Sequence, residues 1–380
     1  MRVTLTDSAL ARYAGRFVWL ELNFDSPPNQ KFLTVHAVSY TPSFYILDPA
    51  DEHPLATQLG AMNLRELLAF LERAETSFLA KVKSPQDVAL SKGDELLGHA
   101  QFTEAAKLFG EALKEGARDW PEHDNAIASY TWSLMLSYQS QQCAETAVTE
   151  APRMNRGGVF GRVVLSGLNC INQVDPTPWA DTALQRIQPL AAEAIALPAT
   201  VRDHRYQIYQ QLMSAAKARA DEITVKKWGD LWLKELDSTT PTNDDERSAL
   251  DIARVDAASL LGDPLRVLPA LIASAQAMPT NYNASLRLAQ MEIEARQYAE
   301  AIASCNHGLA HVTGPIGRTW LLQIKADALV QQNHLSAAHR VLESALSAAR
   351  AIGVRQTRDR NVAKVQKTLA EVEQRNGHSN

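Results

Sequence analysis

Three residues between positions 305 and 311 have the types and spacing of a metal site. Cys305, His307 and His311 form the pattern C-x-H-x-x-x-H, and histidines four residues apart share one face of a helix, where both imidazoles can bind one ion. Cys305, however, falls at a position of the helical pattern that packs inward. The two histidines are therefore expected to be solvated, and we predict neither a bound metal nor any other cofactor.

The chain contains three cysteines, Cys143, Cys170 and Cys305, and they are widely spaced. Their number and spacing exclude a disulfide scaffold and a C-x-x-C redox pair. Cys143 and Cys170 lie in predicted helices, where a free cysteine behaves as a small hydrophobic residue. We therefore expect free, buried thiols and no redox chemistry at these positions.

Two polar segments also have residue types that could do chemistry, but both precede predicted helices. The segment Asn243-Asp244-Asp245-Glu246 has the composition of a helix N-cap followed by carboxylates that favour the helix dipole. Arg156-Gly157-Gly158 lacks the G-x-x-x-x-G-K pattern of a phosphate-binding loop. We interpret both as helix starts. No catalytic residue is predicted, and the expectation for enzymatic activity leans towards none.

Composition places the chain among globular proteins. Its 380 residues are 46% hydrophobic and 21% charged, with a net charge of −5, and the length suggests two domains or a repeat array. A mixed, mildly acidic surface argues against a nucleic acid partner, and no apolar run could span a membrane. Without a secretory signal at the start, we expect a cytoplasmic protein; the alternative, if the natural chain begins upstream of Met1, is a periplasmic or secreted one.

Residues 1–76 mix helix and strand signals. The sequence predicts a helix at ALARYAG after the capping residues Asp7 and Ser8, and a closing amphipathic helix at MNLRELLAFLERAE. Between them it predicts strands and one short helix, at 17–24 (strand), 30–36 (helix), 43–48 (strand) and 55–60 (strand).

Part of this region, VHAVSYTPSFYILDPADEHPLATQLGAMNLRELLAFLERA, resembles the C-terminal half of a thioredoxin-fold domain. The marks are Tyr40-Thr41-Pro42 before a strand, the strand–turn–strand, Gly60 and the amphipathic helix. The resemblance implies a cis peptide bond before Pro42 and a ledge at Thr41 and Pro42 that offers backbone groups to a substrate strand. The family's C-x-x-C is absent and residues 1–76 contain no cysteine, so this truncated domain is expected not to exchange disulfides.

From residue 85 onward the sequence repeats a helical pattern. QFTEAAKLFGEAL (101–113), QYAEAIASCNHGL (297–309) and HLSAAHRVLESAL (334–346) each resemble the second helix of a tetratricopeptide repeat (TPR). The resemblance implies a mainly α protein in which about seven helical hairpins stack into a TPR-like α-α superhelix, closed by a polar helix at RDRNVAKVQKTLAEVEQ. The predicted domains are a small α/β truncated thioredoxin-like domain (1–76), a linker (77–84) and the helical repeat domain (85–380).

TPR arrays bind peptides or helices in a concave groove, and the resemblance carries groove positions over to this chain. In the first repeat they are Asp87, Leu90, Asp94 and Leu97. In the later repeats they are Ile252, Asp256, Leu286, Gln290, Ile293, Trp320, Gln323 and Asp327. These residues do not match the Lys and Asn set with which some TPR proteins hold an acidic C-terminus. We therefore expect an uncharged or basic, partly apolar segment as the partner.

These observations predict a non-enzymatic scaffold that binds a protein or peptide in the groove of a TPR array. The alternative is a thiol–disulfide oxidoreductase of the thioredoxin family, whose C-x-x-C segment would lie upstream of Met1 and whose helical array would recruit clients. A third interpretation is a hub that assembles with itself, since solenoid surfaces also mediate homo-oligomers. The sequence names neither a partner nor a pathway.

Overall fold

A computed structural model describes residues 5–22, 27–36, 41–79 and 84–377 of the chain. Its internal contacts divide the chain into two compact units, Met1–Thr224 and Val225–Asn380, and each unit is described by itself. The domain limits predicted at residues 76 and 85 both fall inside the first unit. No helix in the described ranges is long and apolar enough to cross a membrane.

The first unit begins with a small sheet and short helices. Its elements are η1 (Ser8–Tyr13), η2 (Pro27–Asn29), α2 (Gln30–Val35), β1 (Ser43–Leu47), β2 (Pro54–Leu59) and α3 (Leu64–Leu79). β1 and β2 pair antiparallel, with Ser43 opposite Leu59 and an irregularity between Ile46 and Leu47. The buried side of the hairpin packs on α3 in a core that includes Tyr13, Ile46 and Leu67. The predicted strands at 43–48 and 55–60 and the predicted helix at 30–36 are thus confirmed.

One prediction for this region holds in part and another is wrong. The ALARYAG segment forms the 3-10 helix η1, capped by the Asp7 side chain, which accepts a hydrogen bond from Ala9 N. Residues 17–22 of the strand predicted at 17–24 form no strand, and residues 23 and 24 lie outside the described residues. Val18 and Leu20 are 89% and 76% exposed. An alternating apolar pattern becomes a strand only where a neighbouring strand takes up its backbone hydrogen bonds, and no described segment does so here.

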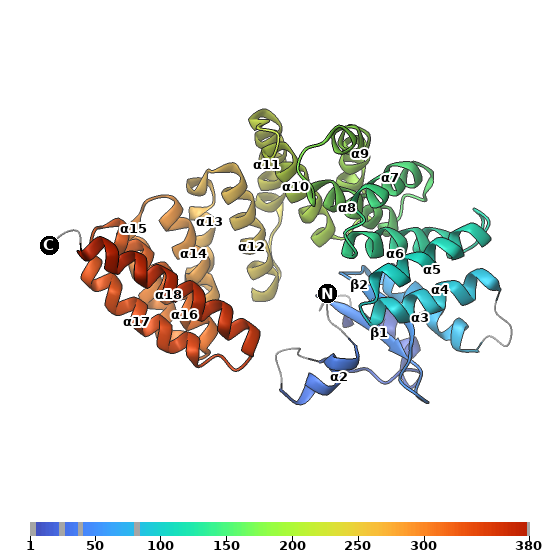
Figure 1. The fold of residues 1–380 in the computed structure, drawn as a ribbon, viewed down its shortest axis with the longest axis horizontal. Coiled ribbons are helices and arrows are strands. Elements are labelled where there is room, and N and C mark those ends of the chain that lie inside the picture. The colour runs from blue at the N-terminus through green and yellow to red at the C-terminus, as the bar shows by residue number, and fades with distance from the viewer. Residues whose placement is uncertain (1–4, 23–26, 37–40, 80–83, 378–380) are drawn as a thin grey trace. The chain divides into compact units, whose positions relative to one another are not determined.

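All of residues 85–377 belong to consecutive helices and short connections (Figure 1). In the first unit these are α4 (Pro85–Gly98), α5 (Phe102–Glu115), α6 (His123–Leu136), α7 (Ser140–Glu150), η3 (Ala151–Arg153), α8 (Gly158–Asn172), α9 (Pro178–Ala196) and α10 (Arg202–Lys217), with the start of α11 (Glu222–Ser238). In the second unit they continue with α12 (Asp244–Leu261), η4 (Pro264–Arg266), α13 (Leu268–Ala277), α14 (Tyr282–Glu294), α15 (Tyr298–His311), α16 (Pro315–Gln331), α17 (Leu335–Arg350) and α18 (Arg355–Gly377). The order fits seven consecutive helix pairs, α4/α5 to α16/α17, followed by the single helix α18.

Local sequence explains where these helices begin and end. The Ser84 hydroxyl caps α4, and Asn243 Oδ1 accepts a hydrogen bond from Glu246 N at 2.9 Å, which confirms the predicted start of α12. Gly262 ends α12 in the left-handed region, at φ +68°. Small residues allow the helices of a pair to approach closely. A Cβ atom on Gly93 of α4 would lie 2.6 Å from the Phe109 ring of α5, so that crossing requires glycine.

Candidate functional site

The Thr41–Pro42 peptide bond is cis, the isomer that the thioredoxin resemblance implied. Tyr40 lies outside the described residues. Thr41 is exposed, and the Pro42 carbonyl oxygen accepts a hydrogen bond from Gly60 N at 2.9 Å, which continues the pairing of β1 and β2 beyond Ser43 and Leu59. One backbone group of the predicted ledge is therefore already used within the hairpin, and a substrate-binding role for Thr41 and Pro42 stays a prediction.

The prediction of free thiols is wrong for two of the three cysteines. Cys143 of α7 and Cys170 of α8 form a disulfide, and both are fully buried. The two helices are neighbours, with 6.1 Å between the cysteine Cα atoms, a proximity that a separation of 27 residues does not reveal. Cys305 is free and buried, as predicted.

The residues of the C-x-H-x-x-x-H pattern do not converge on one point. Cys305 packs into an apolar cluster with Ala289, Val312 and Leu321, and burial raises the pKa of its thiol to about 12. His307 and His311 are exposed on α15, where their ring centroids are 5.1 Å apart. The cysteine and the histidines therefore face different surroundings, in agreement with the expected placement of each.

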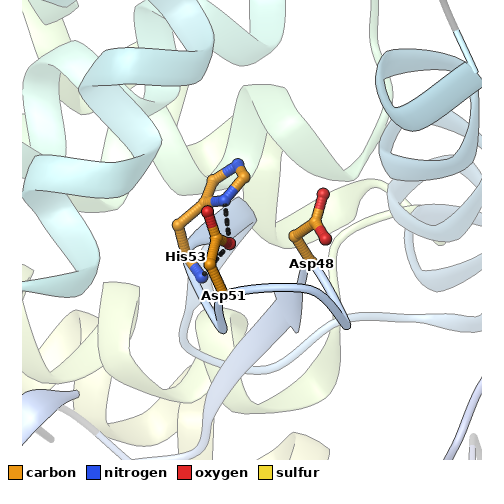
Figure 2. Close-up of side chains that lie close together, drawn as sticks. All are labelled: Asp48, Asp51 and His53. Atoms are coloured by element: carbon orange, nitrogen blue, oxygen red, sulfur yellow. Dashed lines mark hydrogen bonds and ion pairs between the residues drawn. The ribbon is translucent and has the colours of Figure 1, made fainter.

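A different group of potential ligand atoms lies in the β1–β2 turn. Asp48, Asp51 and His53 each bring one such atom within 4.8 Å of the others (Figure 2). Asp48 Oδ1 accepts a hydrogen bond from Ala50 N, and Asp51 Oδ1 contacts both the backbone N–H and the ring Nδ1 of His53. The contact with His53 lowers the pKa of Asp51. These are the side-chain-to-backbone bonds of a turn, and the carboxylates are used in forming it.

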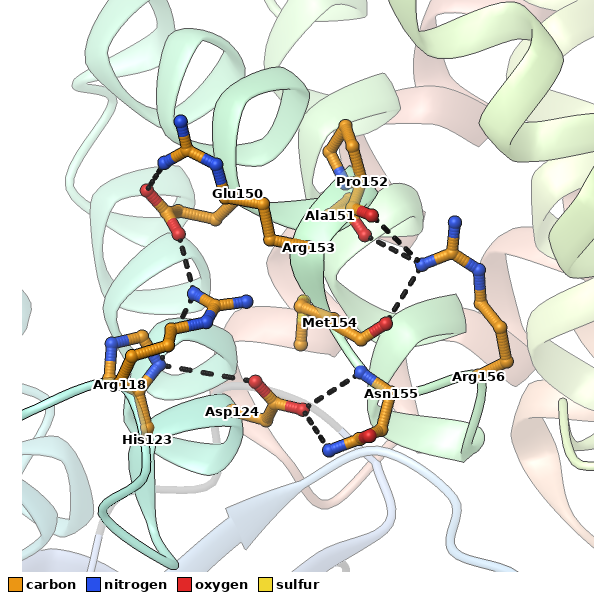
Figure 3. Close-up of polar contacts among 10 residues, drawn as sticks. All are labelled: Arg118, His123, Asp124, Glu150, Ala151, Pro152, Arg153, Met154, Asn155 and Arg156. Carbon is orange, nitrogen blue, oxygen red and sulfur yellow. Dashed lines mark hydrogen bonds and ion pairs between the residues drawn. The ribbon is translucent and has the colours of Figure 1, made fainter.

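Polar contacts join α6, the end of α7 and the connection before α8, and the same connection contains Arg156 (Figure 3). The Arg156 guanidinium donates to the carbonyl oxygens of Ala151 and Met154, at 3.1 and 2.8 Å, and to Glu193 at 2.7 Å. Its hydrogen-bonding groups are therefore occupied by carbonyls at the end of the preceding helix and by a carboxylate. At Gly158 an added Cβ would collide with the Glu66 side chain, so the start of α8 is also covered by an acidic residue. Both observations support the interpretation of this segment as a helix start.

The described residues up to Leu79, called here the N-terminal part, cover three of the four predicted groove positions of the first repeat, whereas Asp87 is half-buried. Leu90, Asp94 and Leu97 of α4 are only 5%, 2% and 3% exposed. β2 packs on α4, and Thr57 Oγ1 donates to the Asp94 carbonyl oxygen at 2.9 Å. In this structure these three groove candidates are therefore covered by the chain itself and form no open groove for a peptide or helical partner.

Further contacts hold the N-terminal part on α8 and on the connection after α9. Arg162 of α8 donates to the Gln58 side chain and lies 3.8 Å from a Glu66 carboxylate oxygen. Arg162 and Glu66 have side chains only 10% and 8% exposed. Burial and the nearby Arg162 charge lower the pKa of His204 to about 3, so His204 is neutral beside this guanidinium. The sequence analysis missed this cluster, since its members are far apart in the chain.

In the second unit most of the predicted groove residues are at least partly exposed. One row, of Ile252, Leu286 and Trp320, recurs on α12, α14 and α16 at intervals of 34 residues. Two shorter rows with the same spacing join Asp256 of α12 to Gln290 of α14 and Ile293 of α14 to Asp327 of α16. α12 contacts α14 and α14 contacts α16, so the rows run across adjacent helices. We call these seven residues the α12–α16 strip. Ile252 is 50% and Trp320 42% exposed, whereas Gln323 is buried.

No protein-family model matches the chain, and no curated protein matches it. Among solved structures, a tetratricopeptide repeat protein from Parabacteroides merdae is 10% identical, with a TM-score of 0.42 over 74% of this chain and 99% of its own. The TPR2AB-domain:pHSP90-complex of yeast Sti1 is 13% identical, with a TM-score of 0.27 over 74% of this chain and 98% of its own. Both TM-scores are below 0.5, so the functional argument rests on the chain itself.

Proposed function

We propose that this protein is a non-enzymatic, TPR-like interaction scaffold that binds a peptide or helical segment along the α12–α16 strip of its second unit. The observation that supports the proposal is the row of Ile252, Leu286 and Trp320, which places an apolar residue at the same position of α12, α14 and α16. Single exposed apolar residues are common on protein surfaces, whereas apolar residues in a row across adjacent helices are typical of a binding surface.

The composition of the strip indicates the chemistry of the partner. Ile252, Leu286, Ile293 and Trp320 offer apolar contacts, and an exposed tryptophan is a frequent anchor in interfaces. Asp256 and Asp327 add two carboxylates and the strip contains no basic residue. A partly apolar segment with basic side chains fits this combination through apolar burial and charge attraction. The first unit is not part of this surface, because its corresponding positions are covered by β2 and α3.

The N-terminal part enters the proposal only as a covering segment. The two-stranded sheet and α3 are compatible with a degenerate thioredoxin-like domain, but the described residues form no larger sheet. The proposal therefore assigns no thiol chemistry to residues 1–76.

The test is a selection of random 12-residue peptides on the full-length protein, followed by binding measurements on individual peptides. Selected peptides should carry apolar and basic residues and should lose at least about tenfold in affinity with Trp320→Ala, the loss typical of an interface anchor. Ile252→Ala should weaken binding too. Ile272→Ala is the matched control, since Ile272 lies on α13 and is 42% exposed. Failure to enrich any peptide, or equal binding to all three variants, would contradict the proposal.

A further inference from the structure

A cavity of about 320 Å³ lies between α3 and α4 in the first unit. Leu55, Leu90 and Asp94, which are buried, line its interior, and Glu72 and Thr76, which are exposed, line its mouth. This volume is in the range of sites that bind small molecules, roughly 300–1,000 Å³. The cavity shares no residue with the α12–α16 strip, so it requires an explanation of its own.

The charges around the cavity are mostly negative. Four carboxylates, from Glu72, Asp87, Asp94 and Glu122, and one guanidinium, from Arg73, line it. Arg73 nitrogens lie 3.7 Å from Asp94 Oδ2 and 3.5 Å from Glu122 Oε2. These distances are longer than those of good hydrogen bonds, so the arginine offsets the negative charge only in part. A cationic ligand would be attracted into this cavity and an anionic one repelled.

Asp94 provides the second, independent observation. Its side chain is 2% exposed, and among the described residues its Oδ1 has no hydrogen-bond partner. Buried polar atoms in proteins nearly always have a partner. Burial is the main reason that the pKa of Asp94 is raised to about 7, while Arg73 lowers it and Glu122 raises it further. A bound cation with N–H groups would supply both the missing donor and a compensating charge.

We propose that this cavity binds a small organic cation, whose guanidinium or ammonium group contacts the Asp94 carboxylate. The aliphatic part of the ligand packs against Leu55 and Leu90, and the carboxylates of Glu72 and Glu122 add to the attraction. The site is independent of the peptide-binding strip, so either proposal can fail while the other holds.

The first experiment is isothermal titration of the full-length protein with butylguanidinium chloride at constant ionic strength. N-butylurea is the matched control ligand, because it has nearly the same shape and no charge. We expect one-to-one binding of butylguanidinium and no measurable binding of N-butylurea. Equal binding of the two compounds, or no binding of butylguanidinium at pH 8, would overturn the proposal.

The second experiment uses variants. Asp94→Asn keeps the shape of the side chain and removes its charge, and should weaken butylguanidinium binding at least about tenfold. Asp175→Asn is the control, since Asp175 is exposed in the connection before α9, outside the cavity. Thr76→Lys, at an exposed helix position, places an ammonium group at the mouth and should also weaken binding. If both cavity variants bind as tightly as the control, the cavity is not the site.

The pH dependence gives a readout that needs no variant. Arg73 of α3 and Glu122, which precedes α6, are the charged groups that face Asp94. With a pKa of about 7, the ionised fraction of Asp94 rises from roughly one tenth at pH 6 to nine tenths at pH 8. The affinity for butylguanidinium should therefore rise about tenfold over this range. An affinity that stays constant between these pH values would contradict the role of Asp94.

Discussion

The side-chain amide of Asn63 donates a hydrogen bond to the backbone carbonyl oxygen of Ala199 across 136 positions of sequence, at 2.9 Å. Asn63 Oδ1 also accepts from Glu66 N, and Glu66 Oε2 accepts from Asn63 N, so the two side chains form a capping box before α3. One residue thus fixes the start of α3 and attaches it to the connection between α9 and α10. The covering of the first unit by its own N-terminal part depends on such contacts.

Arg162→Met should destabilise the first unit by about 3 kcal/mol, because it leaves the buried Glu66 carboxylate without its ion-pair partner. Urea unfolding followed by circular dichroism measures the loss, and hydrogen exchange of peptides from β2 and α8 localises it. Arg153→Met serves as the control. Arg153 has a side chain that is 64% exposed, and its replacement should change stability by less than about 0.5 kcal/mol. Equal effects of the two substitutions would refute the structural role of Arg162.

The disulfide between Cys143 and Cys170 should stabilise the first unit. It spans 27 residues, and the entropy of closing a loop of that size predicts a contribution of roughly 3.5 kcal/mol. Reduction should lower the free energy of unfolding by this amount in the wild type and leave the Cys143→Ala/Cys170→Ala double variant unchanged.

Alkylation of the denatured protein provides a direct check of the disulfide. Only the thiol of Cys305 should react before reduction, and all three cysteines should react after it. Three modified cysteines without any reductant would show that Cys143 and Cys170 are not bonded.

Replacing two helical glycines by alanine should change stability in opposite directions. At Gly167 of α8 the new Cβ would lie 2.5 Å from Ile187 Cδ1 and 2.6 Å from Ala147 Cβ, so Gly167→Ala should destabilise the protein by about 1–3 kcal/mol through overpacking. At Gly110 of α5 the nearest atom lies at 3.5 Å, on Tyr130. Gly110→Ala should therefore stabilise it by up to about 1 kcal/mol through helix propensity. Urea unfolding curves of both variants measure the two changes in stability. A Gly167→Ala protein as stable as the wild type would contradict the close packing of α7, α8 and α9.

Asp94 should make the stability of the first unit depend on pH. Its pKa in the folded protein is about 7, above the ordinary value of 3.8, so between these values the folded state holds the proton more firmly than the unfolded state. Its contribution to stability is fully present below about pH 3.8 and is lost as the pH rises to 7, at up to roughly 1.4 kcal/mol per pH unit. The difference in unfolding free energy between wild type and Asp94→Asn, measured from pH 5 to pH 8, isolates this contribution. A difference that does not vary with pH would show that the carboxyl group is not desolvated.

The helical repeats were predictable because their pattern is local. The segments predicted from 101, 297 and 334 begin as helices at Phe102, Tyr298 and Leu335, one residue from the expectation. Small residues every few positions determine how neighbouring helices pack, and this information lies within one repeat.

The cavity around Asp94 and the disulfide could not be predicted in the same way. Whether Asp94 is exposed or buried depends on β2 and α3, which are placed by contacts with residues as distant as Arg162 and Ala199. The strand prediction for residues 17–22 failed for the same reason, because a strand needs a neighbouring strand to pair with and local sequence does not specify one. The α12–α16 strip was predictable only in part. Its spacing can be read from the sequence, whereas the exposure of its residues can be read only from the structure.

The covering of α4, α8 and the α9–α10 connection by the N-terminal part has a consequence during synthesis. A ribosome adding roughly 5–20 residues per second makes Asn63 well before Ala199, which lies 136 positions later, a delay of roughly ten seconds. During that interval the β1–β2 hairpin packs on α3 and then on α4, but both β2 and α3 lack their later contacts with α8 and with the α9–α10 connection. The nascent chain therefore holds Gln58 and Glu66 without Arg162, and Asn63 without Ala199. The N-terminal part completes its folding only after the third helix pair has emerged.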